Sequence, residues 1–186
     1  CSSDLIKKLK QENNPVTVEP HASEVWRRKF NFVLNENAWT LSRQVSKEVR
    51  LHELQWKINH NIYPTNIILE KMKVVDSNKC DYCMDEVDFI EHFFFHCPLV
   101  NRFWKDIEVM LLCKSSVSIK LSDVDILFGV HKKDFTPKES TFINYILLIG
   151  KMCISIARKT KVLGSLPIIF QQQLNIRRKY VPGFTL

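Results

Sequence analysis

The chain has 186 residues, 45% of them hydrophobic, and its 27 Lys and Arg against 20 Asp and Glu give a formal net charge of +7. This length is typical of one domain or two small ones, and the hydrophobic content is sufficient for a packed core. With only 4 Gly and 7 Pro, the composition excludes a collagen-like or low-complexity chain. The longest uninterrupted apolar run, 145–149, is too short to span a bilayer, so no membrane association is expected.

The N-terminal third is predicted to hold a linker and two amphipathic helices. Residues 1–22 are polar and interrupted by two prolines, which indicates a linker from an upstream domain. Ser23 is predicted to cap a helix over 24–34, and a longer helix is predicted over 40–61, before Pro64. The longer helix repeats apolar residues at three- and four-residue steps, namely Val45, Val49, Leu51, Leu54, Trp56, Ile58 and Ile62. It leaves four basic side chains for water or phosphate: Arg43, Lys47, Arg50 and Lys57.

Shorter helices are predicted on both sides of a Cys-rich segment. Thr65 is expected to cap a helix that ends near Lys73. Asp88 and Glu91 have the spacing of a capping box, which predicts a helix over 89–96.

The rest of the chain is predicted to be helical as well. Pro98 suits the first position of a helix whose apolar stripe contains Leu99, Phe103, Ile107 and Met110. Residues 115–135 are predicted to form a connection with one short helix capped by Ser122, and helices over 137–161 and 167–179 follow. No segment shows the alternation of a strand, so the fold is predicted to be mainly α.

The sharpest motif is Cys80-x2-Cys83-x8-His92-x4-Cys97. Zinc prefers four such ligands in a tetrahedron, with the C-x-x-C turn supplying one edge and the helix before Cys97 the other. His96 is an alternative to His92 as the fourth ligand because it lies one helical turn away. His92 is preferred, because two adjacent residues such as His96 and Cys97 are harder to bring to the same ion. Four protein ligands would make a closed, structural site. The alternative is that the cysteines are buried small hydrophobes and His92 a surface residue.

The cysteine distribution and the start of the chain bear on its setting. Three of the six cysteines are clustered in the motif, while Cys1, Cys113 and Cys153 are scattered. This clustering favours a metal site in a reducing compartment, the cytosol or nucleus, over a disulfide framework. The chain begins with Cys1 and has no signal-peptide pattern, which is typical of a piece of a longer polypeptide. The predicted organisation is therefore a linker over 1–22, a helical zinc-knuckle domain over 23–113 and a basic helical segment over 114–186.

Charge is unevenly distributed along the chain. Residues 80–97 carry five acidic groups and no basic one, whereas residues 142–186 carry seven basic groups and no acid. A one-signed segment is the electrostatic footprint of a phosphate-binding surface, although a solvated helix face is the alternative. Six side chains of this segment are predicted to hold phosphates together with those of the helix over 40–61: Arg158, Lys159, Lys161, Arg177, Arg178 and Lys179.

Aromatic and acidic side chains surround the motif. Phe93, Phe94, Phe103 and Trp104 lie at helical spacing and are predicted to be core residues, whereas Tyr82 is the better candidate for stacking on a base. The acidic residues that could accept a hydrogen bond from the His92 ring are Asp85, Asp88 and Glu91. Signatures of catalysis, such as a Gly-rich phosphate loop or a Tyr-x-Asp-Asp pair, are missing, so the chain is predicted to be non-catalytic.

Several of these residues together resemble a known family. The combination is similar to the zinc-binding C-terminal segment of non-LTR retrotransposon reverse transcriptases, of the long interspersed element type. It consists of the run from Arg50 to Asn66 with its Gln-Trp-Lys and Pro-Thr-Asn, the Cys80 and Cys83 pair, the Glu-His-x4-Cys of 91–97, and Phe103-Trp104. The resemblance implies zinc at the four motif residues. It also implies a region that grips template RNA or target DNA during target-primed reverse transcription, joined to an upstream reverse transcriptase domain that carries the polymerase and endonuclease centres.

Two other interpretations remain open on the sequence. A zinc-stabilised interaction module could dock the parent polymerase or a host partner through an exposed apolar face on the helix over 138–161. A host gene could also have kept this segment of an old element. The preferred interpretation is a zinc-stapled nucleic-acid-binding domain whose binding weakens with salt.

Overall fold

The computed structural model describes residues 21–31, 33–34, 36–115, 118–131 and 135–177. These residues form helices and no strand, which confirms the prediction of a mainly α fold. The helices are α2 (His21–Phe30), α3 (Glu36–Val45), α4 (Val49–Asn59), α5 (Asn66–Lys71), the π-helix η1 (His92–His96), α6 (Pro98–Ser115), α7 (Asp123–Phe128), α8 (Pro137–Lys159), the 3-10 helix η2 (Leu163–Ser165) and α9 (Leu166–Arg177).

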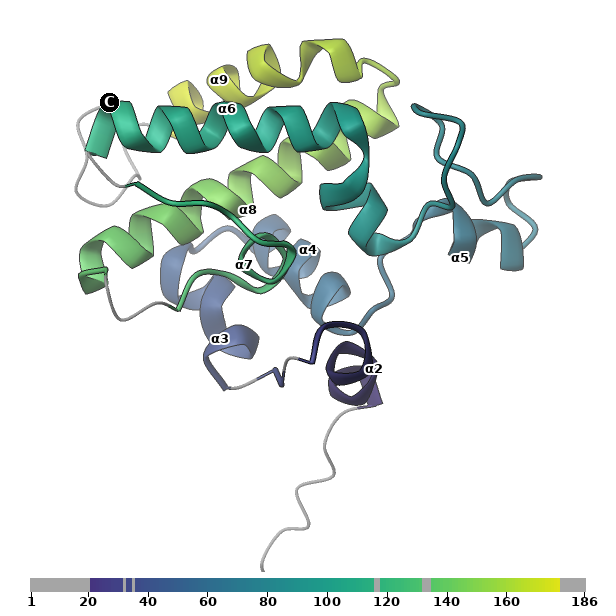
Figure 1. The fold of residues 1–186 in the computed structure, drawn as a ribbon, viewed down its shortest axis with the longest axis horizontal. Coiled ribbons are helices and arrows are strands. Elements are labelled where there is room, and N and C mark those ends of the chain that lie inside the picture. The colour runs from purple at the N-terminus through teal and green to yellow at the C-terminus, as the bar shows by residue number, and fades with distance from the viewer. Residues whose placement is uncertain (1–20, 32, 35, 116–117, 132–134, 178–186) are drawn as a thin grey trace, which may run out of the picture.

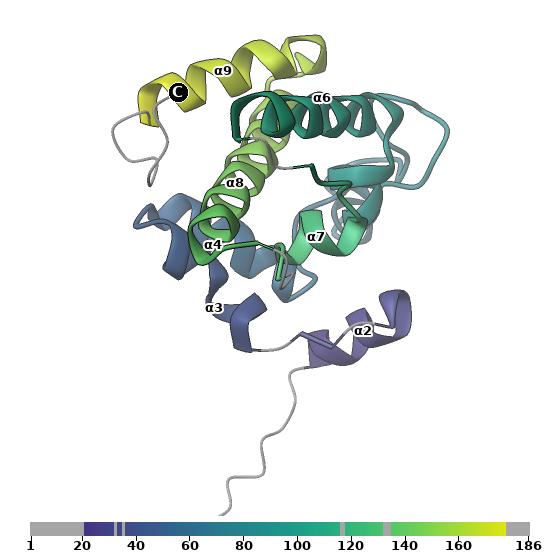
Figure 2. The same cartoon turned by 60° about the vertical axis from the view of Figure 1, so that its left-hand side comes forward.

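Helix α8 runs through the middle of the fold. Figures 1 and 2 show α6 and α9 along one side of α8, and α3 and α4 on the other. Thr136 caps α8 through a capping box with Glu139, and Pro137 takes its first position, so this helix begins where local sequence predicts. Gly150 allows Trp104 of α6 to lie directly on α8, because a Cβ there would be 2.6 Å from the indole ring.

Helix α8 is also long and apolar enough to cross a membrane by length and composition alone. In this structure, however, 78% of its most apolar stretch is buried inside the protein. Residues 142–154 are all buried, so this stretch of α8 belongs to the protein core. Length and apolarity are therefore weak evidence for a membrane span in this helix.

One cluster of buried hydrophobic side chains connects the helices from α2 to α9. It includes Trp26 of α2 and Leu174 of α9, so the segments predicted as 23–113 and 114–186 share a core. The predicted linker over 1–22 lies outside the described residues, apart from the first two residues of α2.

The single helix predicted over 40–61 is wrong, because α3 and α4 are separate helices. The Ser46 hydroxyl accepts a hydrogen bond from the Glu48 N–H at 3.1 Å, and Glu48 has an extended backbone (φ −78°, ψ 115°) as the N-cap of α4. A serine side chain can thus offer the backbone an alternative to continued helix. Three side chains of the predicted apolar pattern are exposed, since Val49 is 75%, Trp56 52% and Ile62 48% exposed.

Other predicted helix starts have mixed outcomes. Ser122 caps α7 through a capping box with Asp125, and Thr65 is the N-cap of α5, which ends at Lys71. Ser23 is not a cap: it lies inside α2, is buried, and its hydroxyl has no hydrogen-bond partner in the described part of the chain.

Candidate metal centre and basic groove

Four side chains with metal-binding atoms converge on one side of the fold. The donor atoms of Cys80, Cys83, His92 and Cys97 all lie within 4.8 Å of one another. The sulfur of Cys80 is 4.0 Å from that of Cys97, and the sulfur of Cys83 is 3.4 Å from Nε2 of His92. Cys83 is half-buried and the other three are buried. The structure thus brings together the four residues of the sequence motif.

The first two donors come from a tight loop between two antiparallel segments. Lys79 and Val87 form an isolated bridge, and the Cys80 N–H donates to the Glu86 carbonyl at 2.9 Å. The Met84 N–H donates to the Cys80 carbonyl at 3.0 Å, and Met84 has a positive φ of 58°. These bonds close the turn, so the C-x-x-C spacing turns both sulfurs toward one point.

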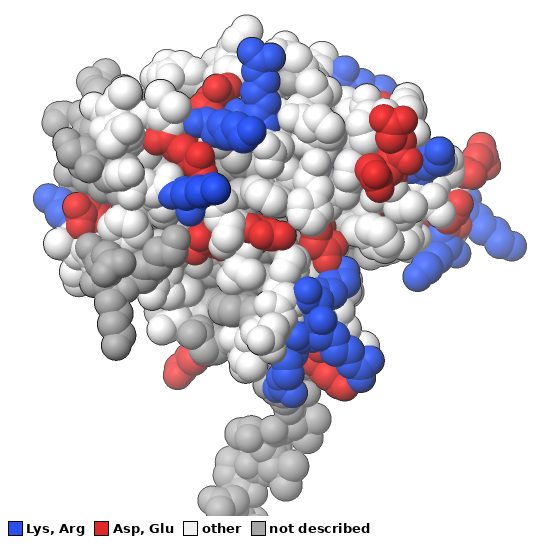
Figure 3. All heavy atoms as spheres, in the orientation of Figure 1, with Lys and Arg blue, Asp and Glu red and all other residues white. Residues whose placement is uncertain are grey.

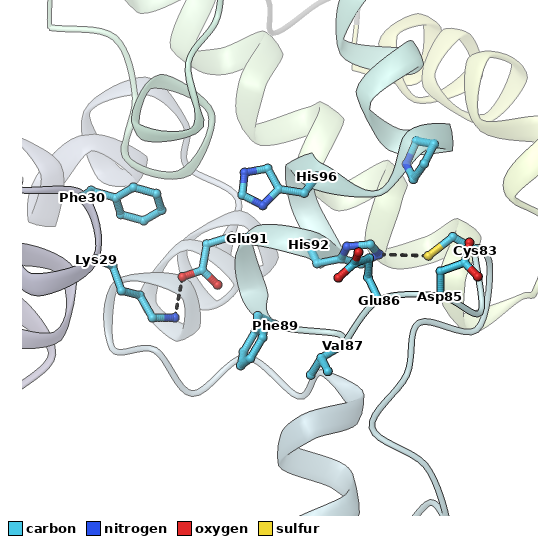
Figure 4. A pocket seen from close by; sticks show the side chains of 11 residues that line it. Lys29, Phe30, Cys83, Asp85, Glu86, Val87, Phe89, Glu91, His92 and His96 are labelled. Carbon is cyan, nitrogen blue, oxygen red and sulfur yellow. Dashed lines mark hydrogen bonds and ion pairs between the residues drawn. The ribbon is translucent and has the colours of Figure 1, made fainter.

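His92 is the first residue of η1, which is a π-helical turn rather than the predicted α-helix, and Cys97 follows as its C-cap. The Cys97 N–H donates to the His92 carbonyl five residues back, at 3.1 Å. The His92 ring points toward Cys83 in Figure 4, whereas His96 lies apart, with Nε2 3.2 Å from a carboxylate oxygen of Asp123. The geometry therefore brings His92, and not His96, to the cysteines. π-Turns are frequent at functional sites.

The donor set fits a zinc ion. Zinc binds thiolate sulfur at about 2.3 Å and imidazole nitrogen at about 2.0–2.1 Å in a tetrahedron. Two sulfurs of such a tetrahedron lie about 3.8 Å apart, and a sulfur and a nitrogen about 3.6 Å apart. The separations of 4.0 and 3.4 Å differ from these values by a few tenths of an ångström. Four protein donors fill the tetrahedron, which is the arrangement of a structural site.

A hydrogen bond between Cys80 and Cys97 gives the two thiols different pKa values. The Cys80 thiol donates to the Cys97 sulfur. This bond lowers the pKa of Cys97 to about 6, while the same bond, together with burial, raises the pKa of Cys80 to about 12. Both thiols must lose their protons to bind zinc, so metal binding releases protons and weakens as the pH falls.

Arg158 of α8 is buried beside the four donors. Its Nη1 donates to Oδ1 of Asp88 at 2.8 Å, its Nη2 to the Cys80 sulfur at 3.5 Å, and its guanidinium lies 3.9 Å from the centre of the Phe93 ring. The side chain is only 6% exposed. Arg158 is therefore not free for the phosphate contact predicted for it, because its guanidinium is enclosed by a carboxylate, a sulfur and an aromatic ring.

Asp88 ties the metal loop to two helices. Its second oxygen, Oδ2, accepts from the backbone N–H of Asn66 at 3.0 Å, so one carboxylate joins α5 to Arg158 of α8. The Asn66 side chain in turn donates to the Lys79 carbonyl at 2.8 Å and to Oδ1 of Asp81 at 2.9 Å. These bonds surround the first cysteine of the motif and fix its position.

The acidic residues near His92 have other roles than those predicted. Asp88 bonds to α5 and α8, and Glu91 forms an ion pair with Lys29 of α2 (Figure 4). The predicted capping box of these two acids is therefore wrong, and no side-chain cap bond occurs at η1. Asp85 is exposed and lines a pocket of about 750 Å³ together with Lys29 and two of the donors, Cys83 and His92.

The aromatic side chains near the motif belong mainly to the core. The predicted core residues Phe93, Phe94, Phe103 and Trp104 are at most 6% exposed, which confirms that prediction. Tyr82 is half-buried, its hydroxyl donates to the Ala157 carbonyl at 3.1 Å, and the Arg158 guanidinium lies 5.1 Å from its ring centre. The side chain predicted to stack on a base is thus held by contacts within the protein.

Six of the predicted phosphate-binding residues line two adjoining pockets between α3, α4, α8 and α9. They are Arg43, Lys47 and Arg177 in a pocket of about 700 Å³, and Arg50, Lys57 and Lys159 in a pocket of about 350 Å³. The pockets adjoin at Met152, which lines the second one and has its sulfur 3.7 Å from Nη2 of Arg177. We call the two pockets together the basic groove. The structure thus places side chains from both predicted basic segments side by side.

The groove has a net positive charge although two carboxylates also line it. Glu48 accepts two bonds from Arg177, at 2.8 and 2.7 Å. Glu53 accepts a bond from Lys57 at 2.6 Å, and this bond lowers the pKa of Glu53. Four further cations of the groove are exposed and form no ion pair with another described residue: Arg43, Lys47, Arg50 and Lys159.

Tyr145 lies against the larger pocket of the groove. Its side chain is 2% exposed, and its hydroxyl has no hydrogen-bond partner among the described residues. Burial raises the pKa of this hydroxyl to about 12, so it keeps its proton at neutral pH. Neither composition nor spacing singles out this residue, because it lies in the most apolar stretch of α8.

The remaining basic residues lie elsewhere. Lys161 is exposed beyond the end of α8, and Arg178 and Lys179 lie outside the described residues. On the face shown in Figure 3, Lys and Arg side chains gather over α2, whose last turn contains Arg27, Arg28 and Lys29. The latter two pair with Glu24 and Glu91. This patch, which the sequence analysis did not consider, is therefore partly neutralised from within the fold.

Comparisons with known proteins bear on the metal centre. The family described as zinc-binding in reverse transcriptase matches residues 2–104. The matched stretch contains all four donors and ends before α8, so Lys159 and Arg177 of the basic groove lie beyond it. A search of curated proteins and a search of solved structures found no match.

Proposed function

Because the chain belongs to the family of zinc-binding regions in reverse transcriptases, we propose that it is a zinc-stapled, non-catalytic region that grips nucleic acid. The parent is proposed to be a non-LTR reverse transcriptase with its polymerase centre upstream in the same polypeptide. The proposed partners are template RNA, target DNA and that upstream domain.

The proposed zinc ligands are Cys80, Cys83, His92 and Cys97, in a knuckle of the CCHC type. Three thiolates and one neutral imidazole give the zinc complex one net negative charge. Arg158 supports this assignment, since its cationic Nη2 lies 3.5 Å from the Cys80 sulfur and offsets that charge. Zinc would thereby fasten the loop to the C-terminal end of α8, the helix that also carries Lys159 of the basic groove.

The observation that carries the nucleic-acid proposal is the basic groove. Its cations come from α3, α4, α8 and α9, and phosphate contacts of this kind dominate the affinity of nucleic-acid-binding proteins. The rival docking function depends on an exposed apolar face of α8, and the burial of residues 142–154 supports the nucleic-acid proposal instead.

Replacing Arg50 by Gln tests this proposal. Arg50 is exposed and unpaired in the groove, so we expect the variant to bind single-stranded RNA more weakly and the slope of log affinity against log salt to become shallower by about 0.7–1. Fluorescence anisotropy of a labelled oligonucleotide at several salt concentrations measures both effects. The matched control is Lys105→Gln on α6, which removes an exposed charge outside the groove. Equal effects of the two substitutions, or a salt-independent affinity in the native chain, would refute the proposal that the groove binds the nucleic acid.

A further inference from the structure

An exposed group of aromatic rings lies on the outer surface of α3 and α4. The His60 ring centre is 5.0 Å from that of Trp39 and 4.5 Å from that of Trp56. Trp56 is 52% exposed, and Trp39 and His60 are half-exposed. Tryptophan is among the residues with the highest average burial, so an open indole packed against a second, tilted ring is an unusual surface feature. We call these three residues the aromatic platform.

Basic side chains of the groove border the aromatic platform on both helices. Arg43 follows Trp39 by four residues on α3, so the two share a helix face. Lys57 follows Trp56 directly on α4, and Glu53, one turn before Trp56, lines the same pocket as Lys57. On both helices, a residue that lines the groove thus lies one turn from a tryptophan of the platform, namely Arg43 from Trp39 and Glu53 from Trp56.

We propose that the aromatic platform stacks on the bases of a single-stranded nucleic acid whose phosphates follow the basic groove. The inference rests on the proposed nucleic-acid function and adds the kind of strand that is bound. In a duplex, the base faces are stacked on one another and cannot reach a protein ring, whereas the bases of a single strand can. Aromatic rings beside a cationic groove are the usual arrangement of proteins that bind single strands without reading sequence.

The charge of the surroundings favours a nucleic acid over an apolar peptide as the occupant. Arg43, one turn from Trp39, is exposed and forms no ion pair with another described residue, so it can match a phosphate backbone. A further observation agrees with stacking: His60 already packs against both indoles, so the rings are held in place before a base arrives. Preorganised rings lose little conformational entropy on binding.

Replacing Trp56 by Ala is the decisive substitution, since Trp56 is 52% exposed and is not part of the hydrophobic core. We expect affinity for labelled oligouridine to fall about tenfold, because base stacking contributes about 1–3 kcal/mol per base. Affinity for a duplex of the same length, and for heparin, which has charges but no bases, is expected to stay unchanged. Trp56→Phe is expected to keep most of the affinity for oligouridine. The matched control is Val49→Ala, an exposed apolar residue of the same helix outside the platform.

The outcomes separate this inference from the proposed function. If Trp56→Ala binds oligouridine as tightly as the native chain while Arg50→Gln binds it weakly, the platform is refuted and the groove stands. A loss of equal size for oligouridine, duplex and heparin would also refute stacking, because heparin has no base to stack. If the native chain binds none of the three polyanions, the proposed function itself fails.

Discussion

We expect the substitution Cys83→Ser to abolish stoichiometric zinc binding and to destabilise the chain, whereas Cys113→Ser leaves both properties unchanged. Cys83 is one of the four clustered donors, while Cys113 is an exposed free cysteine on α6. A serine hydroxyl is a poor substitute for a thiolate, so the site loses one of its ligands. At free zinc a thousandfold above the dissociation constant, the metal stabilises the folded state by about 4 kcal/mol, and this contribution is lost.

Two measurements check this expectation. Zinc per chain is determined by elemental analysis, and urea unfolding is followed by circular dichroism with and without a chelator. The native chain and Cys113→Ser are expected to contain one zinc and to lose stability on chelation. A Cys83→Ser chain that still holds one zinc, or a native chain whose unfolding is indifferent to chelation, would show that the cluster does not fasten the fold.

The substitution Arg158→Gln is expected to lower the free energy of unfolding by about 3–5 kcal/mol, because it leaves the buried Asp88 carboxylate without its cation. Its neighbour Lys159 provides the matched control, since this residue is exposed and lines the basic groove. Lys159→Gln is expected to change stability little and to weaken RNA binding. Adjacent residues would thus separate the structural role from the binding role.

Denaturant unfolding and RNA affinity, measured on both variants, decide between these roles. An Arg158→Gln chain of native stability with reduced RNA affinity would contradict the structural role. It would support the phosphate contact that the charge pattern predicts for Arg158. The opposite pair of results, an unstable Arg158 variant and a weakly binding Lys159 variant, is the one expected from the burial of the two side chains.

Features that depend on residues close together in the sequence were predictable. The Ser122 cap of α7 and the start of α8 at Pro137 depend on residues close together in the chain, so both were predicted. The spacing of Cys80, Cys83, His92 and Cys97 is likewise local, because all four lie within one loop and the turn that follows it. The preference for His92 over His96 followed from the same short-range argument.

Features that depend on distant contacts were not predictable. Arg158 lies in the basic segment, and its burial depends on Asp88, 70 residues earlier in the chain. Lys151 is fully buried as well, donating to the Leu127 carbonyl at 3.0 Å and to the Gln55 side chain at 2.5 Å, and burial lowers its pKa to about 7. Counting charges along the sequence treats such residues as surface cations. The contacts that remove them from the surface appear only in the folded chain.

The exposed position of Trp56 escaped the sequence analysis for a different reason. The apolar positions predicted over 40–61 lie on two different faces of a helix. Trp56 is two residues from both Leu54 and Ile58, so it lies on the face opposite theirs. Only the face with Leu54 and Ile58 packs on the core, and the apolar repeat alone does not say which of the two faces is buried.

X-ray absorption at the zinc edge tests the proposed ligand set most directly. For the native chain we expect a first shell of three sulfurs at about 2.3 Å and one nitrogen at about 2.0–2.1 Å, with no oxygen ligand. In the Cys83→Ser chain, any residual zinc is expected to show fewer sulfur neighbours. A native first shell dominated by nitrogen and oxygen would contradict the assignment of Cys80, Cys83, His92 and Cys97 as the zinc ligands.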